Sequence, residues 1–368
     1  MNRLLNRVPW LWLFVLAAVA YPLVPGLNDD AFKFTGQFIG PSLTTIFIYA
    51  ILALGLNVVV GNAGLLHLGI GAFFGIGAYI TGILTVEAYP FELPFVACLL
   101  AATLGSAVLA VLLSAPVLRL RGDYFALVTL GFGEVLRFTL RNLEEITAGT
   151  KGLKPINPPW HLDLGLPENL TFEWSDYRTY YFFALAFLVA VLVVLRNLEK
   201  SEVGRAWVAL REDELAAACM GLNVAHLKLG AIALGAGLAG MAGCVFAYVQ
   251  RNTTDPDQFG FTVSIITLSC LILGGVGNRA GVILGVLLVF GFDNVISQIV
   301  DSKLQERLAA SADPATGDVR VFGLAIGNTG SPYLNFSGWR LAVFGLALII
   351  IMRFRPAGLL PAVRGKGA

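Results

Sequence analysis

The chain has 368 residues, of which 57% are hydrophobic and 13% charged, and its formal net charge is +1. A soluble protein carries about a quarter charged residues, so this composition excludes an ordinary water-soluble enzyme or binding domain and favours a membrane protein. The net charge carries no information about nucleic acid, but the chain lacks the dense basic block that such a partner requires, so none is predicted.

Long apolar segments follow one another along the chain, most of them long enough to cross a bilayer. The first, residues 10–27, follows two arginines as a signal peptide would, but no small-residue cleavage site follows it, so we predict a retained span. The others are residues 39–60, 65–86, 94–118, 124–143, 179–196, 226–250, 261–277, 281–299 and 338–352. The pattern predicts an all-α, polytopic transmembrane bundle of about ten helices, forming a single membrane domain over residues 1–368.

The distribution of lysine and arginine predicts an orientation. Basic residues gather in alternate connections and in both termini, which places these on the cytoplasmic side of a bacterial inner membrane. Residues 144–178 and 300–337 are rich in proline, glycine, asparagine and charge, and are predicted to be extracytoplasmic loops.

Residues 55–79 combine a predicted helix interruption with a predicted packing face. Gly61, Asn62 and Gly64 would break a helix at a membrane boundary, which favours part of a solute path. Gly71 and Gly75 are four positions apart, so they share one helix face that a neighbouring backbone can approach closely. A packing groove is the simpler interpretation. The polar candidates for the path in this part of the chain are Asn57 and His67.

Three charges interrupt the apolar segment 124–143. Glu134, Arg137 and Arg141 lie on one helical face, and each central charge costs about 2.5–3.5 kcal/mol in a membrane. The charged face should therefore contact protein or water. One interpretation is that Glu134 and Arg137 lock the bundle; the other is that they line or gate a pathway.

Residues 199–223 are polar and lie between two strong spans, on the predicted cytoplasmic side. Residues 205–220 favour a short amphipathic helix, and Gly221 is a good C-terminal stop. The segment is interpreted either as a solvated connector or as a projection that docks on another protein.

Residues 261–285 are predicted to form two helices joined by a tight turn at Arg279. Gly277 and Gly281 belong to a repeat of glycines every four residues, which predicts a second close-packing face. The four cysteines and three histidines show no metal-ligand spacing, so we predict no metal site and no cofactor.

Six motifs in this order resemble the LivM-type permeases of the branched-chain amino-acid importers driven by ATP-binding-cassette (ABC) ATPases. They are ALGLNVVVGNAGLL, GAFFGIGAY, LRLRGDYFALVTLGFGE, VGRAWVALREDELAAACMGLN, LILGGVG and FRPAGLL. The resemblance covers most of residues 41–360, and the urea and short-chain amide permeases share nearly the same blocks. It implies a fold similar to the ribose-type and vitamin B12-type importer permeases.

The resemblance also implies partners. These are a homologous second permease subunit, two cytoplasmic ATPase subunits and a periplasmic solute-binding protein, besides a small-molecule solute and membrane lipid. Residues 199–223 would then be the cytoplasmic coupling element, with an ATPase-docking set similar to the family's at Glu214, Ala216, Ala217 and Gly221. No GxxxxGK[ST] segment is present, so ATP would be bound by another polypeptide and no catalysis is expected here.

The chain departs from the family pattern at polar positions. His67 stands at a usual serine, Ile70 at a usual histidine, and Ile266 at a position that is often acidic. The identity of the solute is therefore left open among branched-chain amino acids, urea and short amides. A secondary transporter using Glu134 as an ion site is the rival of another class, and a membrane-embedded enzyme lacks a nucleophile–base set.

Overall fold

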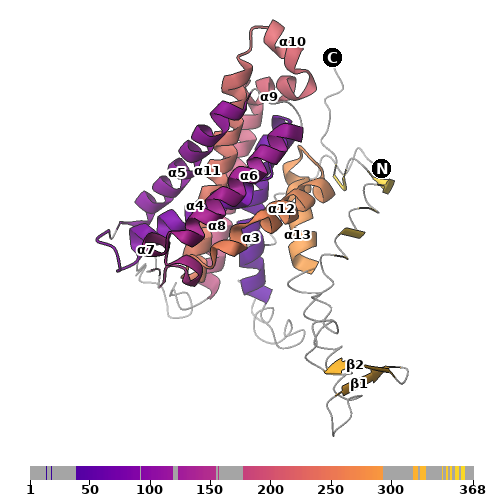
Figure 1. The fold of residues 1–368 in the computed structure, drawn as a ribbon. Coiled ribbons are helices and arrows are strands. Elements are labelled where there is room, and N and C mark those ends of the chain that lie inside the picture. The colour runs from indigo at the N-terminus through magenta and orange to yellow at the C-terminus, as the bar shows by residue number, and fades with distance from the viewer. Residues whose placement is uncertain are drawn as a thin grey trace, which may run out of the picture.

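The computed structural model describes residues 39–91, 93–118, 123–154 and 177–292, with isolated residues and short stretches elsewhere (Figure 1). The first half contains α3 (Ile39–Asn57), η2 (Val58–Asn62), α4 (Ile70–Thr85), α5 (Phe95–Ser114), η3 (Ala115–Val117), α6 (Asp123–Asn142), α7 (Glu144–Thr147) and η4 (Gly149–Lys151). The second half contains α8 (Tyr177–Lys200), α9 (Glu202–Glu212), α10 (Glu214–Cys219), α11 (Val224–Gln250), η6 (Pro256–Phe259), α12 (Phe261–Gly274) and α13 (Arg279–Gly291).

Within the described residues, five helical segments are long and apolar enough to cross a membrane. They are Pro41–Asn62, Phe95–Val117, Arg178–Lys200, Val224–Gln250 and Pro256–Gly274. Two shorter apolar helices, α4 and α13, accompany them. The chain is therefore a helical, multi-pass membrane protein. Most of the predicted spans 10–27 and 338–352 lies outside the described residues.

The structure corrects several predicted boundaries. The span expected at 65–86 begins only at Ile70, because Gly64 has a φ of +73° and the chain stays non-helical up to Gly69. The span expected at 124–143 is the helix α6, but its charges keep it out of the set of apolar spans. A turn separates α12 from α13, as predicted, and α13 starts at Arg279.

The two predicted loops contain local structure. Residues 144–154 form α7 and η4, and this segment pairs with the chain after α11: the Thr253 amide donates to the Leu153 carbonyl (3.1 Å). The part of 300–337 that the structure describes is an antiparallel hairpin of β1 (Asp318–Val321) and β2 (Leu324–Asn328), with a register shift between Val319 and Arg320.

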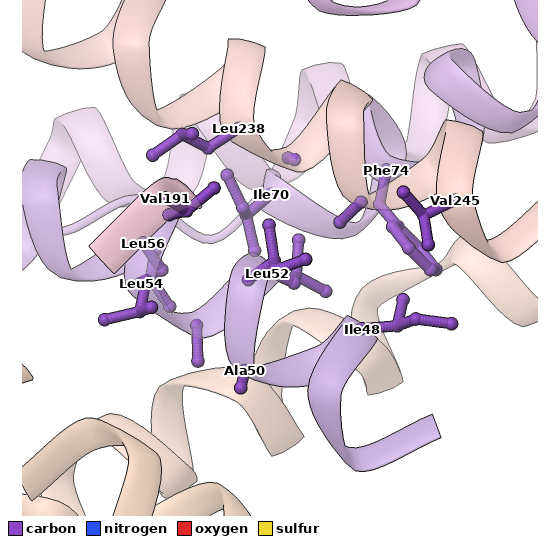
Figure 2. Packing of buried hydrophobic residues seen from close by; sticks show 14 of the residues in the cluster. Ile48, Ala50, Leu52, Leu54, Leu56, Ile70, Phe74, Val191, Leu238 and Val245 are labelled. Atoms are coloured by element: carbon purple, nitrogen blue, oxygen red, sulfur yellow. The ribbon is translucent and has the colours of Figure 1, made fainter. Parts of the chain in front are cut away.

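The core surrounds α11, which packs against α3, α4 and α5. Large aliphatic and aromatic side chains from α3, α4, α8 and α11 fill it, among them Leu52, Phe74, Val191 and Val245 (Figure 2). Glycines bring the helix backbones together. A Cβ on Gly77 would lie 2.5 Å from the Gly240 Cα, and a Cβ on Gly55 would lie 2.8 Å from the Gly235 carbonyl oxygen.

The outer face of α5, unlike this core, exposes its apolar side chains. Every fourth residue is a large aliphatic side chain that is more than half exposed: Val96, Leu100, Leu104, Val108 and Leu112. Side chains four residues apart share one helix face. A continuous apolar stripe of this length is suited to contact membrane lipid or an apolar surface of another subunit.

Candidate functional site

The helix that begins with α3 is interrupted inside the bundle. After Asn57 the backbone widens into the π-helical turn η2, and residues 63–69 connect it to the start of α4. The buried Asn57 side chain accepts a hydrogen bond from the Gly277 amide at 2.9 Å. Gly61 leaves the room that this contact needs, since a Cβ there would lie 2.8 Å from the Gly277 nitrogen. Asn57 therefore ties the interruption to the α12–α13 turn.

His67 lies within the interruption. Its side chain is buried beside the rings of Phe73 (5.8 Å) and Phe125 (6.4 Å), and its Nδ1 has no hydrogen-bond partner. The following amide, that of Leu68, donates to the Thr129 hydroxyl on α6 at 3.1 Å. The loop is thus held against α6, with a polar ring inside an apolar environment.

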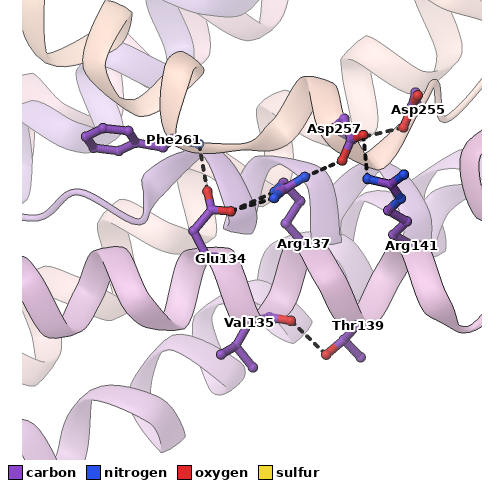
Figure 3. Close-up of polar contacts among 8 residues, drawn as sticks. All are labelled: Glu134, Val135, Arg137, Thr139, Arg141, Asp255, Asp257 and Phe261. Atoms are coloured by element: carbon purple, nitrogen blue, oxygen red, sulfur yellow. Dashed lines mark hydrogen bonds and ion pairs between the residues drawn. The ribbon is translucent and has the colours of Figure 1, made fainter.

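The charged face of α6 contacts the segment that precedes α12 (Figure 3). Arg137 bonds to Glu134 through Nε (2.8 Å) and also forms an ion pair with Asp257 of η6. Arg141 reaches the same Asp257 carboxylate at 3.0 Å. Glu134 accepts a further hydrogen bond from the Phe261 amide at 3.1 Å, which satisfies a free donor at the start of α12.

This network uses the charges that the sequence places on one face of α6. The pairing of Glu134 with Arg137 agrees with the bundle-locking interpretation. Asp257 was not predicted, and no local pattern could have found it, because it lies 120 residues from Arg137. Glu134, the ion site of the rival transporter hypothesis, is already occupied by an arginine and a backbone amide.

The four predicted packing glycines lie in different environments. A Cβ on Gly71 would lie 3.0 Å from the Gly260 carbonyl oxygen, and one on Gly75 would lie 2.8 Å from the Phe259 side chain. A Cβ on Gly281 would lie 2.6 Å from the Gly274 carbonyl oxygen, across the α12–α13 pair. Gly277 is a correction: it lies in the turn before α13, with a φ of +85°, and not on a helix face.

The segment 199–223 forms two helices and not the single one that was expected over 205–220. Asp213 separates α9 from α10 because its side chain accepts the amides of Leu215 (2.9 Å) and Ala216 (3.0 Å), as an N-cap does. The sequence carries this signal, because an aspartate is followed there by good helix formers. Gly221 ends α10 with a φ of +83°.

Polar bonds hold this pair of helices on the bundle. The ammonium of Lys228, whose side chain is 7% exposed, forms an ion pair with Glu214 at 2.7 Å. The Trp207 indole donates to the Leu227 carbonyl at 2.9 Å. Arg211 at the end of α9 donates to the carbonyl of Gly61 in η2. Lys228 and Arg211 were missed by sequence reasoning, since each contact joins separate elements.

α10 forms a tip at one end of the molecule (Figure 1). It exposes apolar side chains: Leu215 is 66% exposed and Met220, just after the helix, 83%. Of the predicted docking set, Glu214, Ala216 and Gly221 are exposed, whereas Ala217 is buried. An exposed apolar helix end that polar bonds fix to the bundle is suited to contact another protein.

No group of histidine, cysteine, aspartate and glutamate in the described part of the chain could hold a metal ion. An interrupted helix in the core, an ion-pair network on α6 and an exposed helix at one end are the main features of this helical membrane protein, and they are suited to a transporter.

Comparison with known proteins identifies the family. Residues 38–352 match the model of the permease component of branched-chain amino acid transport systems, so the chain belongs to this family. It is 36% identical over 337 residues to the high-affinity branched-chain amino acid transport permease LivM of Salmonella typhimurium, covering 87% of this chain and 69% of that protein. The Escherichia coli LivM is similar at 36% over 336 residues, with the same coverage.

A more distant relative is a probable LivM permease of Methanocaldococcus jannaschii. It is 25% identical over 348 residues, or 85% of this chain and 90% of that protein. No solved structure matches the chain. The curated relatives are named as transport permeases.

Proposed function

We propose that this chain is the pore-forming permease subunit of an ABC importer for branched-chain amino acids. The observation that carries the proposal is the family match over residues 38–352, together with 36% identity to two LivM permeases. Branched-chain amino acids are the solutes named for both relatives, and this supports them over urea and short amides as the solute here.

The proposed complex contains a homologous second permease, two cytoplasmic ATPases and a periplasmic solute-binding protein. The chain would lie in the bacterial inner membrane as one domain, in a bundle resembling the ribose-type and vitamin B12-type permeases, with both termini in the cytoplasm. The interrupted helix, α9 and the α12–α13 turn meet at one end, through the contacts of Asn57 and Arg211. This agrees with the alternation of sides that the basic residues predict.

In this proposal, α10 docks on an ATPase. Its exposed Leu215 and Met220 provide the apolar contact, and the Glu214–Lys228 ion pair keeps α10 fixed to α11. ATP binding closes the ATPase dimer, the coupling element 199–223 moves with it, and the permease pair alternates between outward-open and inward-open states.

The solute path is proposed to include the interruption between η2 and α4. Irregular backbone at membrane depth occurs where it is buried in protein or lines a cavity. Asn57 and His67 lie there, and Glu134 with Arg137 lies on the adjacent α6, where its ion-pair network is suited to gate or brace the path.

Reconstitution tests the proposal. The chain, co-expressed with its ATPases, second permease and binding protein, is placed in proteoliposomes, and uptake of radiolabelled leucine, isoleucine and valine is measured with ATP. We expect uptake that requires ATP and the binding protein and resists a protonophore. A matched complex with a hydrolysis-dead ATPase is the control.

Two results would contradict the proposal. Uptake by the chain alone that a protonophore abolishes would indicate the secondary transporter. Competition by urea or acetamide, but not by leucine, would assign the transporter to the urea and amide group.

A further inference from the structure

Arg211 joins the coupling element to the interrupted helix. It belongs to the last turn of α9, next to the exposed tip, and its guanidinium donates to the carbonyl of Gly61, 150 residues away in sequence. The side-chain stem lies on the interruption itself: a Cβ on Gly64 would be 2.6 Å from the Arg211 Cγ and 3.2 Å from its Cβ. The end of α9 is thus seated directly on residues 61–64.

The carbonyl that Arg211 binds needs an external donor. At a helix C-terminus the last carbonyls have no partner within the helix and carry a partial negative charge. Beyond η2 the amides of Ala63 and Leu65 bond to the carbonyls of Val58 and Val59, which leaves the Gly61 carbonyl to Arg211. A guanidinium at this position therefore makes a charge-assisted hydrogen bond that the backbone cannot replace.

α9 and α10 are built to move together. Only Asp213 separates them, and its amide bonds to the Ala209 carbonyl (3.1 Å) while its own carbonyl accepts from Ala217 (3.0 Å). No flexible linker lies between Arg211 and the tip. A displacement of α10 is therefore transmitted to the end of α9.

The other side of the interruption is fixed elsewhere. Asn57 accepts a hydrogen bond from the Gly277 amide in the α12–α13 turn. The end of α12, just before this turn, is held by Leu360, whose amide donates to the Gly274 carbonyl at 2.9 Å. One side of η2 is thus anchored to a helix pair, and the other is held by α9 through Arg211.

We propose that Arg211 is a positioning residue that transmits movement of the coupling element to the helix interruption at Gly61–Gly64. This inference rests on the proposed function, because it takes the ATPase as the source of the movement. In this role Arg211 sets where the backbone of the interruption lies for each position of α10.

The test compares Arg211→Ala with wild type in the reconstituted complex, measuring ATP hydrolysis and amino-acid uptake together. We expect the ATPases to remain bound and to hydrolyse ATP, while uptake per ATP falls about tenfold or more, as loss of one charge-assisted hydrogen bond would allow. Arg211→Lys should retain part of the coupling, because lysine keeps the charge but not the planar fork.

Arg205→Ala is the matched control. Arg205 lies on the same helix, is exposed, and donates to the Lys200 carbonyl without touching the interruption. Its loss should leave uptake per ATP unchanged. Gly64→Ala is a second variant with Arg211 intact, and it should also uncouple. Position 64 has a φ of +73°, which a residue with a Cβ rarely adopts, and the added methyl would meet the Arg211 stem.

Hydrogen exchange separates transmission from a purely structural role. In the wild-type complex, ATP binding should change amide exchange both at the tip (213–222) and at residues 58–65. In Arg211→Ala, only the tip should respond. Normal uptake per ATP in Arg211→Ala, an unchanged response at 58–65, or loss of the bound ATPases would each overturn the inference. Absence of ATP-driven uptake by wild type would instead refute the proposed function.

Discussion

The seam between α4 and α11 and the helix pair α9–α10 are held in place in different ways. Along the seam, glycines on both helices allow backbone contact, as at Gly77 and Gly240, and apolar side chains surround them. The pair α9–α10 instead exposes Leu215 and Met220 on α10 and just after it. Polar bonds such as the Glu214–Lys228 pair attach it to the bundle, together with the buried Trp207 and Leu210 of α9.

The difference separates a fixed part of the molecule from a part suited to be moved. Two helices whose backbones are in contact along a glycine seam cannot slide past each other without a steric clash. Closely packed interiors change between discrete arrangements and do not deform continuously. A few polar bonds at one end can break and re-form at modest cost. Substitutions in the two regions should therefore differ in cost, with the largest loss of stability where α11 is closely packed.

Gly240→Leu should prevent folding. A Cβ at this position would lie 2.5 Å from the Ala102 carbonyl oxygen and 2.6 Å from the Ser106 Cβ, so a leucine must separate α11 from α5. We expect a loss above about 3 kcal/mol, beyond the usual range for overpacking, seen as lost membrane accumulation and a lowered Tm in detergent.

Gly230→Leu is the matched control on the same helix. A Cβ on Gly230 would lie 4.0 Å from the Trp207 ring, and the position is exposed. The change should be within about 1 kcal/mol of neutral, because leucine is the better helix former. Equal losses at 230 and 240 would show that the close packing of α11 against its neighbours does not distinguish the two positions.

Arg137→Met should destabilise more than Arg141→Met. The Arg137 side chain is 16% exposed and lies between two carboxylates, whereas that of Arg141 is 43% exposed and contacts one. We expect about 1–3 kcal/mol for Arg137→Met, after discounting for partial exposure, and under about 1 kcal/mol for Arg141→Met. Tm values in detergent compare the two, and the reverse ranking would mean that the lock on α6 is misassigned.

Removing Glu214 should cost more stability than removing Lys228, its partner in the ion pair. Glu214→Leu leaves the buried Lys228 ammonium unpaired and should cost about 1–2 kcal/mol. Lys228→Met removes the buried charge and leaves an exposed glutamate in contact with water, so its effect should be under about 1 kcal/mol. The Tm of each variant in detergent measures the loss of stability. A larger loss in Lys228→Met than in Glu214→Leu would contradict this account.

Met220→Asp should have the smallest effect on stability, under about 0.5 kcal/mol, since the side chain is 83% exposed. Its effect on ATPase binding should be large, because a charge replaces an apolar contact. Co-purification of the ATPases and uptake measure this. If copurification and uptake were unchanged in Met220→Asp, the exposed end of α10 would not be the site that binds the ATPase.

Features that depend on neighbouring residues could be predicted from the sequence. The interruption at Gly61–Gly64, the Glu134–Arg137 pair and the glycine stop at Gly221 each follow from local spacing, and the structure contains all three. The helical, membrane-spanning character followed from composition in the same way.

Features that depend on contacts between distant segments could not be predicted. Asp257 joins Arg137 across 120 residues, and Arg211 joins Gly61 across 150. A periodic pattern shows which face of a helix is polar but not which other segment meets it. For Gly277, a four-residue spacing indicated a packing face, but the residue takes the positive φ of a turn, which spacing alone does not reveal.

The native cysteine on α10 provides the most direct test of the account. Cys98, Cys244 and Cys270 are buried, whereas Cys219 is exposed on the tip. A membrane-impermeant maleimide should label Cys219 in inside-out vesicles and not in right-side-out vesicles, and bound ATPases should protect it. Labelling from the periplasmic side, or cytoplasmic labelling that the ATPases leave unchanged, would contradict the assignment of α10 as the docking tip.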